Sequence, residues 1–482
     1  MITDSFHRHR FSFVIEWNVK VILMENVSTK EKLSVISGSC LGFIGILIGT
    51  SLVVTFPTLI HEFNTRLAVV QWLASGYYLV ATITMSTTAY LMKHFPLRRI
   101  FMLAALAFIP GCLISAFAQS IGMLLIGCMI NAFATGIATP LMYQIVFHSI
   151  PQDQFGKYNG IVTMIKSFGP AFGPTYGGLL TYLISWRMIF IIVLPLLVVA
   201  LGVGMYSLKK EKVETVSTPF DYLGLILFGA TVITFSLVIS NLGTQIHHPE
   251  SLIGLLIGSI VLLGAFIYEN QHSKRKYLSF RIVKNQVVCF RLISFFSLQF
   301  MNLSLVFILP LYAEEVLHYN SLITGMLLLP GAVIGALLSP VSGKIYDKKG
   351  AFFTLTLSSG FLFAGVALYL ISFKLLTAFL IGMIYIVFRL GYTFGFGNIM
   401  SDAGKYVSAA DHSLVSSIFN TFQQYSGTIG TSLMSSIITI FEGLGLSEAS
   451  AILTGGRIGL IILVIIAIAL IGITIYVRQL EK

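Results

Sequence analysis

Two cationic side chains lie inside long apolar stretches, where an ionisable group is costly and usually functional. Lys166 falls in the stretch 159–183, and Arg389 falls deeper in the stretch 375–398. Lys166 could face a central cavity, or its long side chain could extend to the membrane surface. The side chain of Arg389 reaches the membrane surface less easily, because Arg389 lies deeper in its apolar stretch. We predict that Arg389 acts on proton coupling or on substrate charge, the alternative being a structural bond to backbone carbonyls.

Two adjacent acids, Glu314 and Glu315, lie in LPLYAEEVLHYN at the outer end of another apolar stretch. A carboxyl group partly removed from water there could carry a proton. The alternative is an exposed pair in an outer loop. Asp221, Glu269 and Asp402 are expected at the membrane interface.

Uncharged polar residues inside the apolar stretches are candidates for lining a substrate cavity, with three bulky neighbours as apolar walls. For each of them an interhelical hydrogen bond is the alternative. The polar candidates are Asn131, Gln144, Gln299, Asn302, Asn420, Gln423 and Gln424, and the walls are Tyr143, Phe300 and Met301.

The sequence gives no sign of catalysis or of metal binding. The histidines His247, His248 and His412 have no partners at metal-ligand spacing. P-loop, HExxH and Ser/His/Asp-type motifs are missing. We therefore expect no enzyme activity, no cofactor and no metal site.

A glycine-rich run, GIVTMIKSFGPAFGPTYGG, lies inside an apolar stretch long enough to span a bilayer. Small residues let neighbouring helices approach closely, and a proline bends a helix. The run therefore predicts a bent, tightly packed helix that could be a moving part of a transporter, although any polytopic protein can contain such a packing helix. Its defining residues are Gly160, Gly169, Gly173, Pro174, Gly177 and Gly178.

The composition predicts the elements that position these residues. Hydrophobic residues make up 56% of the 482 and charged residues only 10%, against about 25% charged in soluble domains. The chain is therefore an all-α polytopic membrane protein, and fourteen spans of about 20 residues can be drawn. They are 33–58, 70–92, 99–118, 121–145, 159–183, 187–208, 222–242, 252–269, 288–313, 321–343, 352–372, 375–398, 409–440 and 456–477.

The net charge of +11 reports topology rather than a nucleic-acid partner. With fourteen spans and a cytoplasmic N-terminus, nearly all Lys and Arg outside the spans fall on the cytoplasmic side, as the positive-inside rule requires. Both termini are then cytoplasmic, and we expect the protein to lie in the plasma membrane. Residues 1–23 lack the features of a signal peptide, and we expect translation to start at Met24.

The spans divide the chain into two groups of six with a pair between them. The expected parts are a cytoplasmic segment 1–32, a six-helix bundle 33–208, cytoplasmic linkers 209–286 with the inserted pair 222–269, a six-helix bundle 287–477 and a tail 478–482. Basic turns occupy corresponding positions in the two bundles, at 93–99 and at 343–350. Such halves predict a repeat-built transporter with its binding site between them.

The chain resembles the fourteen-span branch of drug:proton antiporters in the major facilitator superfamily over roughly residues 33–477. The run from Gly160 to Gly178 resembles that branch's antiporter motif. Five other matches occur in the right order: Gln71-Trp72 with Tyr78-Leu79, Trp186-Arg187 with Phe190 and Pro195, Thr324-Gly325 with Leu328 to Gly331, the loop residues Gly343, Asp347, Lys348 and Gly350, and Gln424 with Gly427, Gly430 and Ser432.

Departures from the family pattern concern the residues often tied to proton coupling. The family's fourth-span pattern RxxQGxG aligns with Cys128, Asn131 and Ala132, so its membrane arginine is absent here. The acid of the first span aligns with Ile48 and is also absent. Arg389 is at the mirror position of the missing arginine. With two cations and no first-span acid, the cavity should favour anionic, zwitterionic or neutral substrates over dications.

The resemblance implies the major facilitator fold and proton-coupled efflux of small amphipathic compounds, including antibiotics, by alternating access. The loop at 343–350 is then a cytoplasmic gate in which Asp347 forms a latch. Small molecules, protons and the lipid bilayer are the expected partners, and we expect a monomer. The alternatives are a dedicated exporter of one metabolite, lipid or fatty acid, and a carrier or sensor without proton coupling.

Overall fold

The computed structural model describes residues 27–151, 155–209, 220–243, 249–273, 277, 280–408 and 412–481. Met24, His247 and His248 lie outside the described residues, so the start site stays a prediction. Among the described residues helices account for the regular structure and no strand occurs, which confirms the all-α prediction.

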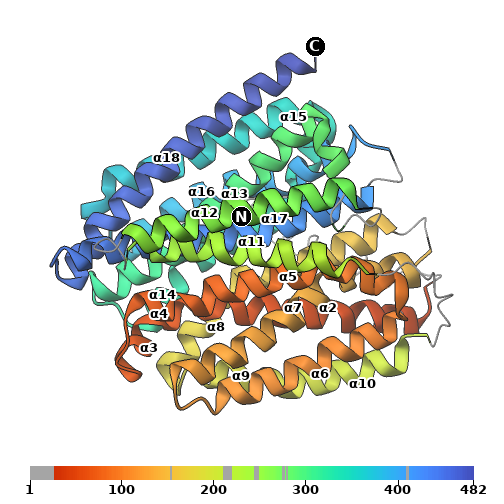
Figure 1. Cartoon of the computed structure of the whole chain (residues 1–482), viewed down its shortest axis with the longest axis horizontal. Helices are drawn as coiled ribbons and strands as arrows, with labels where there is room; N and C mark the ends of the chain where they lie inside the picture. Colours follow the sequence, from red (N-terminus) through yellow and green to blue (C-terminus); the bar gives the residue numbers. More distant parts are fainter. Residues whose placement is uncertain are drawn as a thin grey trace, which may run out of the picture.

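The helices fall into two bundles, which we call the N-half and the C-half. The N-half contains α2 (Thr29–Ser51), η1 (Val53–Thr55), α3 (Phe56–Glu62), α4 (Leu67–Val70), α5 (Trp72–His94), α6 (Leu97–Ala116), α7 (Ile121–Ser149), α8 (Phe155–Leu183), α9 (Met188–Ile191) and α10 (Val193–Ser207). The C-half contains α13 (Gln286–Glu315), α14 (Ser321–Leu327), α15 (Leu329–Ser372), η4 (Phe373–Leu375), α16 (Ala378–Gly404), α17 (His412–Gly443) and α18 (Glu448–Leu480). The halves lie side by side in Figure 1.

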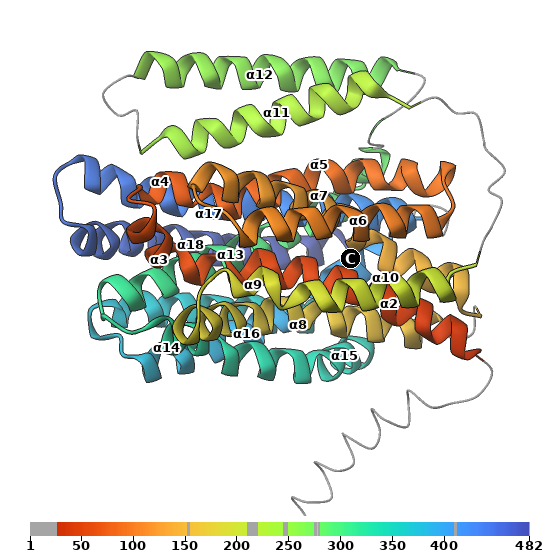
Figure 2. The ribbon, with the colours of Figure 1, turned by 90° about the horizontal axis from the view of Figure 1, so that it is seen from below.

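Two helices between the halves in sequence, α11 (Tyr222–Asn241) and α12 (Pro249–His272), form a hairpin followed by η3 (Phe280–Lys284). Figure 2 shows this hairpin against one side of the bundles. It covers the line where α5 meets α17, because Ser240 accepts a bond from Gln71 at 3.4 Å and donates to Ser432 at 3.1 Å. The inserted pair therefore contacts both halves.

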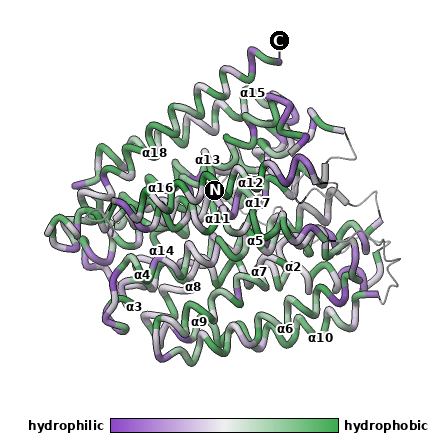
Figure 3. Tube along the Cα trace, in the orientation of Figure 1, coloured by the Kyte–Doolittle hydropathy of each residue, from purple (hydrophilic) through white to green (hydrophobic). Residues whose placement is uncertain are grey.

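Local sequence explains where many helices begin. Ser28 and Glu31 form a reciprocal capping box at the start of α2. Asn285 and Asn320 cap α13 and α14 through their side-chain oxygens. Hydrophobic residues run along the helices and hydrophilic residues gather at their ends (Figure 3).

Eleven helical stretches among the described residues are long and apolar enough to cross a membrane. The chain is therefore a multi-pass membrane protein. One of these stretches, Ser321–Leu375, contains a break at Gly350, whose φ of 81° and ψ of 175° are not helical. The long helices α8 and α17 are not among the eleven.

We call the end of the bundle where α2 begins and α18 ends the terminal end, and the opposite end, with α3 and α14, the far end. At the far end of the N-half, Trp186 Nε1 and Arg187 Nη1 donate to the Glu62 carboxylate at 2.6 and 2.7 Å. This contact ties the start of the sixth span to α3.

Candidate functional site

A cavity lies between the two halves, near the middle of the helices. Four N-half helices (α2, α5, α7 and α8) and three C-half helices (α13, α16 and α17) contribute to its wall. The lining residues are Ile46, Gly49, Thr50, Tyr77, Tyr78, Met85, Thr135, Thr139, Lys166, Pro170, Gln299, Asn302, Leu303, Arg389, Tyr392, Phe396, Gln423 and Gln424. Its volume is about 70 Å³, against about 300–1,000 Å³ for ligand pockets, so this conformation is too closed for a drug-sized molecule.

Arg389 is a nearly buried cation in this wall, with 6% of its surface exposed. Its Nη1 donates to Oδ1 of Asn302 at 3.1 Å, and its guanidinium lies 4.5 Å from the centre of the Tyr392 ring. Its Nε is buried and has no hydrogen-bond partner in the described part of the chain. Tyr392 is held in turn by donation to Gln299 at 2.7 Å.

Lys166 is the second cation in the wall, and it joins the two halves. Its Nζ on α8 donates to Oδ1 of Asn420 on α17 at 3.2 Å. The same Nζ lies 5.8 Å from the centre of the Tyr143 ring. Lys166 therefore faces the interior rather than extending to the terminal end.

The described lining residues include these two cations and no aspartate or glutamate. The cavity therefore has an uncompensated positive charge in a partly desolvated site, where Coulomb interactions are stronger than in water. Hydroxyl and amide groups supply the remaining polarity.

Six of the ten predicted cavity residues lie in the cavity wall or directly behind it. Gln299, Asn302, Gln423 and Gln424 line the cavity with Lys166 and Arg389. Tyr143 and Asn420 lie just behind it as contacts of Lys166.

The other four candidates lie outside the cavity wall. Asn131 is fully buried beside α6, where Cys112 Sγ donates to it at 3.5 Å. Phe300 and Met301 are buried in the packed core of α13, and Gln144 is half-buried on α7.

Sequence reasoning missed several aromatic lining residues, and two of them had signals. Tyr78 belongs to one of the family-like stretches. Tyr392 follows Arg389 by three residues, so both lie on one helix face. Tyr77 had no such signal; its hydroxyl donates to the Gly45 carbonyl at 2.7 Å and lies 2.6 Å from Thr135 Oγ1, which joins α2, α5 and α7.

The glycine-rich run forms most of α8, where Gly160 lies near the start of the helix. A Cβ at Gly169 would meet the Ile46 side chain at 2.6 Å, and Cβ atoms at Gly173 and Gly177 would collide with Thr50 and Ser51. The glycines therefore let α8 pack closely on α2, as predicted for a tight helix pair.

Gly178 and Pro174 contact the other half of the protein instead. A Cβ at Gly178 would collide with the Ser321 carbonyl on α14, and one at Gly325 would lie 2.5 Å from the Pro174 carbonyl oxygen. Thr175 Oγ1 also donates to the Gly325 carbonyl at 2.8 Å. These contacts between α8 and α14 hold the two halves together at the far end of the bundle.

The loop-like residues Gly343, Asp347, Lys348 and Gly350 lie at the terminal end, where α15 breaks. Asp347 and Lys348 are exposed. Gly343 is helical, and no described atom lies within 4 Å of a Cβ built on it. Gly350 takes the positive φ that L-residues disfavour. The turn is therefore built on Gly350.

Glu314 and Glu315 end α13 at the far end and are both half-buried. Oε1 of Glu314 is buried without a hydrogen-bond partner in the described part of the chain. The two acids lie far from the cavity-lining residues along α13, since Asn302 is three turns away.

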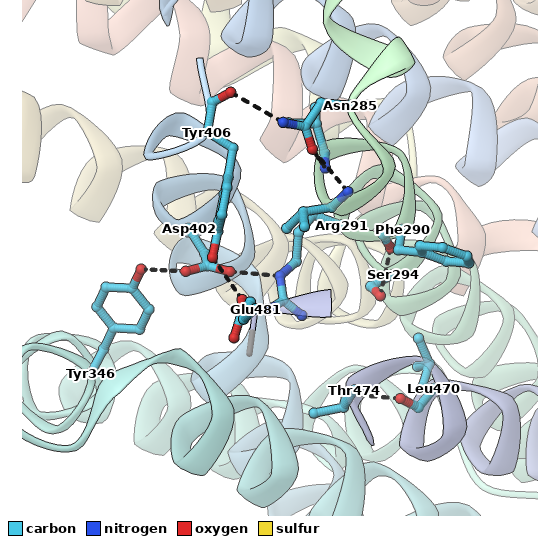
Figure 4. A network of polar contacts seen from close by, with 12 residues as sticks. Asn285, Phe290, Arg291, Ser294, Tyr346, Asp402, Tyr406, Leu470, Thr474 and Glu481 are labelled. Carbon is cyan, nitrogen blue, oxygen red and sulfur yellow. Dashed lines mark hydrogen bonds and ion pairs between the residues drawn. The ribbon is translucent and has the colours of Figure 1, made fainter. Parts of the chain in front are cut away.

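A buried ionic cluster at the terminal end of the C-half was not anticipated from the sequence (Figure 4). Arg291 Nε donates to Asp402 Oδ2 at 2.6 Å, and Tyr346 donates to Oδ1 of the same carboxylate at 2.9 Å. Glu481 accepts from Arg291 at 3.4 Å and from Tyr406 at 2.8 Å. The cluster ties α13, α15 and α16 to the end of α18.

Comparison with known proteins places this architecture in a family. Residues 38–431 match the Major Facilitator Superfamily, and the chain belongs to that family. It is a membrane transporter rather than an enzyme.

Similar proteins include two bacterial relatives. The lincomycin resistance protein LmrB of Listeria monocytogenes is 30% identical over 429 residues, covering 86% of this chain and 90% of the relative. The MFS-type transporter YcnB of Bacillus subtilis is 32% identical over 443 residues, covering 86% and 89%. A crystal structure of the POT family transporter PepTSo aligns with a TM-score of 0.67 at 15% identity, covering 95% of this chain and all of that chain, which supports the fold alone.

Proposed function

We propose that the protein exports small amphipathic compounds, antibiotics among them, by alternating access between its two halves. The observation that carries the proposal is the central cavity, whose wall is shared by both halves and combines aromatic rings with polar groups. The relative named for lincomycin resistance supports the direction and the substrate class, and the relative named as an MFS-type transporter supports transport alone. The cavity would have to widen for a drug-sized compound to enter, as rocking of the halves allows.

The chain is proposed to cross the plasma membrane fourteen times. The eleven apolar stretches become fourteen if the helix break at Gly350 separates two spans and if α8 and α17 are counted. The two added helices are less apolar because they contribute Lys166, Gln423 and Gln424 to the cavity. Both termini would then be cytoplasmic, with the hairpin α11–α12 inserted between two six-helix bundles. We propose that the protein works as a monomer, because each chain forms its own cavity.

The roles of the site residues follow from their positions. Lys166, Arg389, Gln299, Asn302, Gln423 and Gln424 would contact substrate. The glycines of α8 would act as the sliding contact, since they pack on α2 and on α14. Gly350 would shape the turn at the cytoplasmic gate.

Proton coupling is proposed to involve a site away from the cavity wall, because the described residues of that wall include no carboxylate. Glu314 is the candidate because its Oε1 is buried and unpaired within the described residues. An exporter dedicated to one metabolite, lipid or fatty acid, and a carrier without coupling, are the rival functions that share this fold.

The test uses inside-out vesicles energised to an acidic interior. The panel contains lincomycin, a zwitterionic fluoroquinolone, a fatty acid and a dicationic dye, and vesicles without the protein serve as the control. Proton release on addition of several chemically distinct compounds would support multidrug antiport. Release with one compound only would favour a dedicated exporter. Accumulation of a compound that persists with a protonophore would point to a carrier without coupling.

A further inference from the structure

The charge of the central cavity has no counterpart within the described part of the protein. Arg389 is more than nine-tenths buried, yet its Nε makes no hydrogen bond there, and its neighbours Asn302 and Tyr385 offer it only neutral oxygens. A buried cation without a paired anion carries a desolvation cost that hydrogen bonds to neutral groups and ring contacts offset in part, and that a negatively charged ligand would offset further. Arg389 therefore lines the cavity as a buried cation with no counter-charge among the described residues.

Lys166 also has no anionic partner among the residues that the structure describes. The acceptor at its Nζ is another neutral amide oxygen, that of Asn420 at 3.2 Å. A carboxylate adds the Coulomb attraction of a full negative charge, which a neutral amide oxygen lacks. An anion in the cavity would therefore compete well with Asn420 for Lys166.

The rest of the wall is suited to a flat apolar body. Tyr78 faces the cavity from the N-half, and Tyr392 and Phe396 face it from the C-half. Phe396 stacks on Tyr392, with ring centres 5.1 Å apart. Aromatic side chains bury large areas and pack against other rings with defined geometry.

We propose that Lys166 and Arg389 form an anion subsite that binds one carboxylate of the transported compound, whose aromatic or apolar body rests on the Tyr78, Tyr392 and Phe396 side. The inference rests on the proposed function, in that the central cavity is taken as the substrate site. It narrows the substrate class to compounds that carry an anionic group, including zwitterions.

The subsite also connects binding to the movement of the halves. Lys166 belongs to the N-half and Arg389 to the C-half, so one carboxylate would contact both. The anion would take over the link that Lys166 and Asn420 supply without substrate. A neutral or cationic analogue cannot form an ion pair with Lys166, so it cannot replace the contact between Lys166 and Asn420 with an ionic one.

The first experiment compares three probes that share one ring system and differ in charge: naphthylacetate, naphthylacetamide and naphthylmethylamine. Their binding to the purified full chain is measured by calorimetry. We expect naphthylacetate to bind about tenfold more tightly than the amide and the amine to bind most weakly. Equal binding of the acid and the amide would overturn the proposal, and this comparison needs no variant.

Variants then locate the subsite. Arg389→Gln and Lys166→Gln should each reduce naphthylacetate affinity about tenfold and reduce naphthylacetamide affinity by a clearly smaller factor. Arg457→Gln and Lys374→Gln are the matched controls, because both cations are exposed and neither lines the cavity. If Arg389→Gln fails to fold, Arg389→Lys keeps the charge but removes the fork geometry, and should weaken the acid selectively. Loss of both affinities in parallel would indicate a structural role and would contradict the subsite.

Transport separates this inference from the proposed function. If vesicles export lincomycin or the amide but the acid has no advantage, export stands and the anion subsite falls. If the acid binds selectively at Lys166 and Arg389 but no compound is transported, the subsite stands and the proposed export falls.

Discussion

Arg291 and Asp402 form a buried ion pair that joins α13 to α16, with 2.6 Å between Nε and Oδ2 and side chains only 2% and 3% exposed. Tyr346 occupies the second carboxylate oxygen, so Asp402 is bonded on both sides. A buried charge pair contributes little relative to an apolar pair, but removing one member leaves a costly unpaired charge. The pair therefore fixes the relative positions of the helices at this end of the C-half.

Asp402→Asn should destabilise the protein by about 3–5 kcal/mol, because the buried Arg291 then keeps only the longer contact with the partly exposed Glu481, at 3.4 Å. The measurement is the thermal unfolding midpoint of the purified protein in detergent. Asp347→Asn is the matched control, because Asp347 lies at the same end of the bundle and is exposed. Its expected change is within about 0.5 kcal/mol.

The double change Arg291→Met with Asp402→Leu provides the second comparison for this pair. It removes both charges, so it should recover much of the stability that Asp402→Asn loses. Equal stability of Asp402→Asn and the unchanged protein would show that the pair does not carry the packing of these helices.

Gly178→Ala should slow transport about tenfold or more while the protein still folds. The added Cβ would collide with the backbone carbonyl of Ser321, which no side-chain rotation can relieve. The halves would then be held apart at the far end, and the closed conformation would be disfavoured. Initial efflux rates in vesicles give the readout, with protein amounts matched by immunoblot.

Gly202→Ala on α10 is the control for Gly178→Ala, because an added Cβ there meets no atom within 4 Å. It should leave transport unchanged and slightly stabilise its helix. Normal transport by Gly178→Ala would argue that the contact between α8 and α14 plays no part in the transport cycle.

Much of the fold was predictable because long apolar runs can only be satisfied as helices in a bilayer. The inserted pair predicted at 222–269 corresponds to α11 and α12. The glycine spacing indicated a tightly packed helix, and α8 packs closely on two neighbours. Lys166 and Arg389 were found because a charge inside an apolar run is conspicuous.

The pairings between helices could not be predicted in the same way. Arg291 and Asp402 are 111 residues apart, and each lies near a helix end, where charges are expected in any case. Asp347 was expected to form the latch, whereas the structure leaves Asp347 exposed and buries Asp402. Helical periodicity gives the faces of a helix but not the partner that each face meets.

Gly350→Ala should cost about 1–3 kcal/mol, because its φ of 81° and ψ of 175° lie in a region that essentially only glycine occupies. No neighbouring atom lies within 4 Å of the added Cβ, so the cost would come from the backbone alone. Thermal unfolding again gives the measurement.

Gly343→Ala is the control for Gly350→Ala, because it also adds a Cβ in open space but at a residue whose φ and ψ are helical. Gly343 is helical and also has open space around it, so alanine should be neutral or stabilising by up to about 1 kcal/mol. If both alanine variants behaved alike, the break in α15 at Gly350 would not be a fixed feature of the protein.

Glu314→Gln should abolish substrate-induced proton movement and leave substrate binding within about twofold of the unchanged protein. Glutamine keeps the shape and polarity of the side chain but cannot gain or lose a proton near neutral pH. Oε1 of Glu314 is buried without a partner among the described residues, so its charged form is poorly solvated and its protonation should respond to opening of the far end. Proton release is measured in energised vesicles, and binding by calorimetry.

Glu315→Gln is the control for this last variant, since Glu315 is the next residue and lies within electrostatic range of Glu448, His61 and His318. Those groups can share or offset its charge, so its loss should change proton movement less. If Glu314→Gln still released protons at the normal rate while Glu315→Gln did not, the coupling carboxylate would be Glu315. If both variants kept normal proton release, the group that carries the proton would lie elsewhere than at this end of α13. The cavity cations Lys166 and Arg389 would then be the next groups to test.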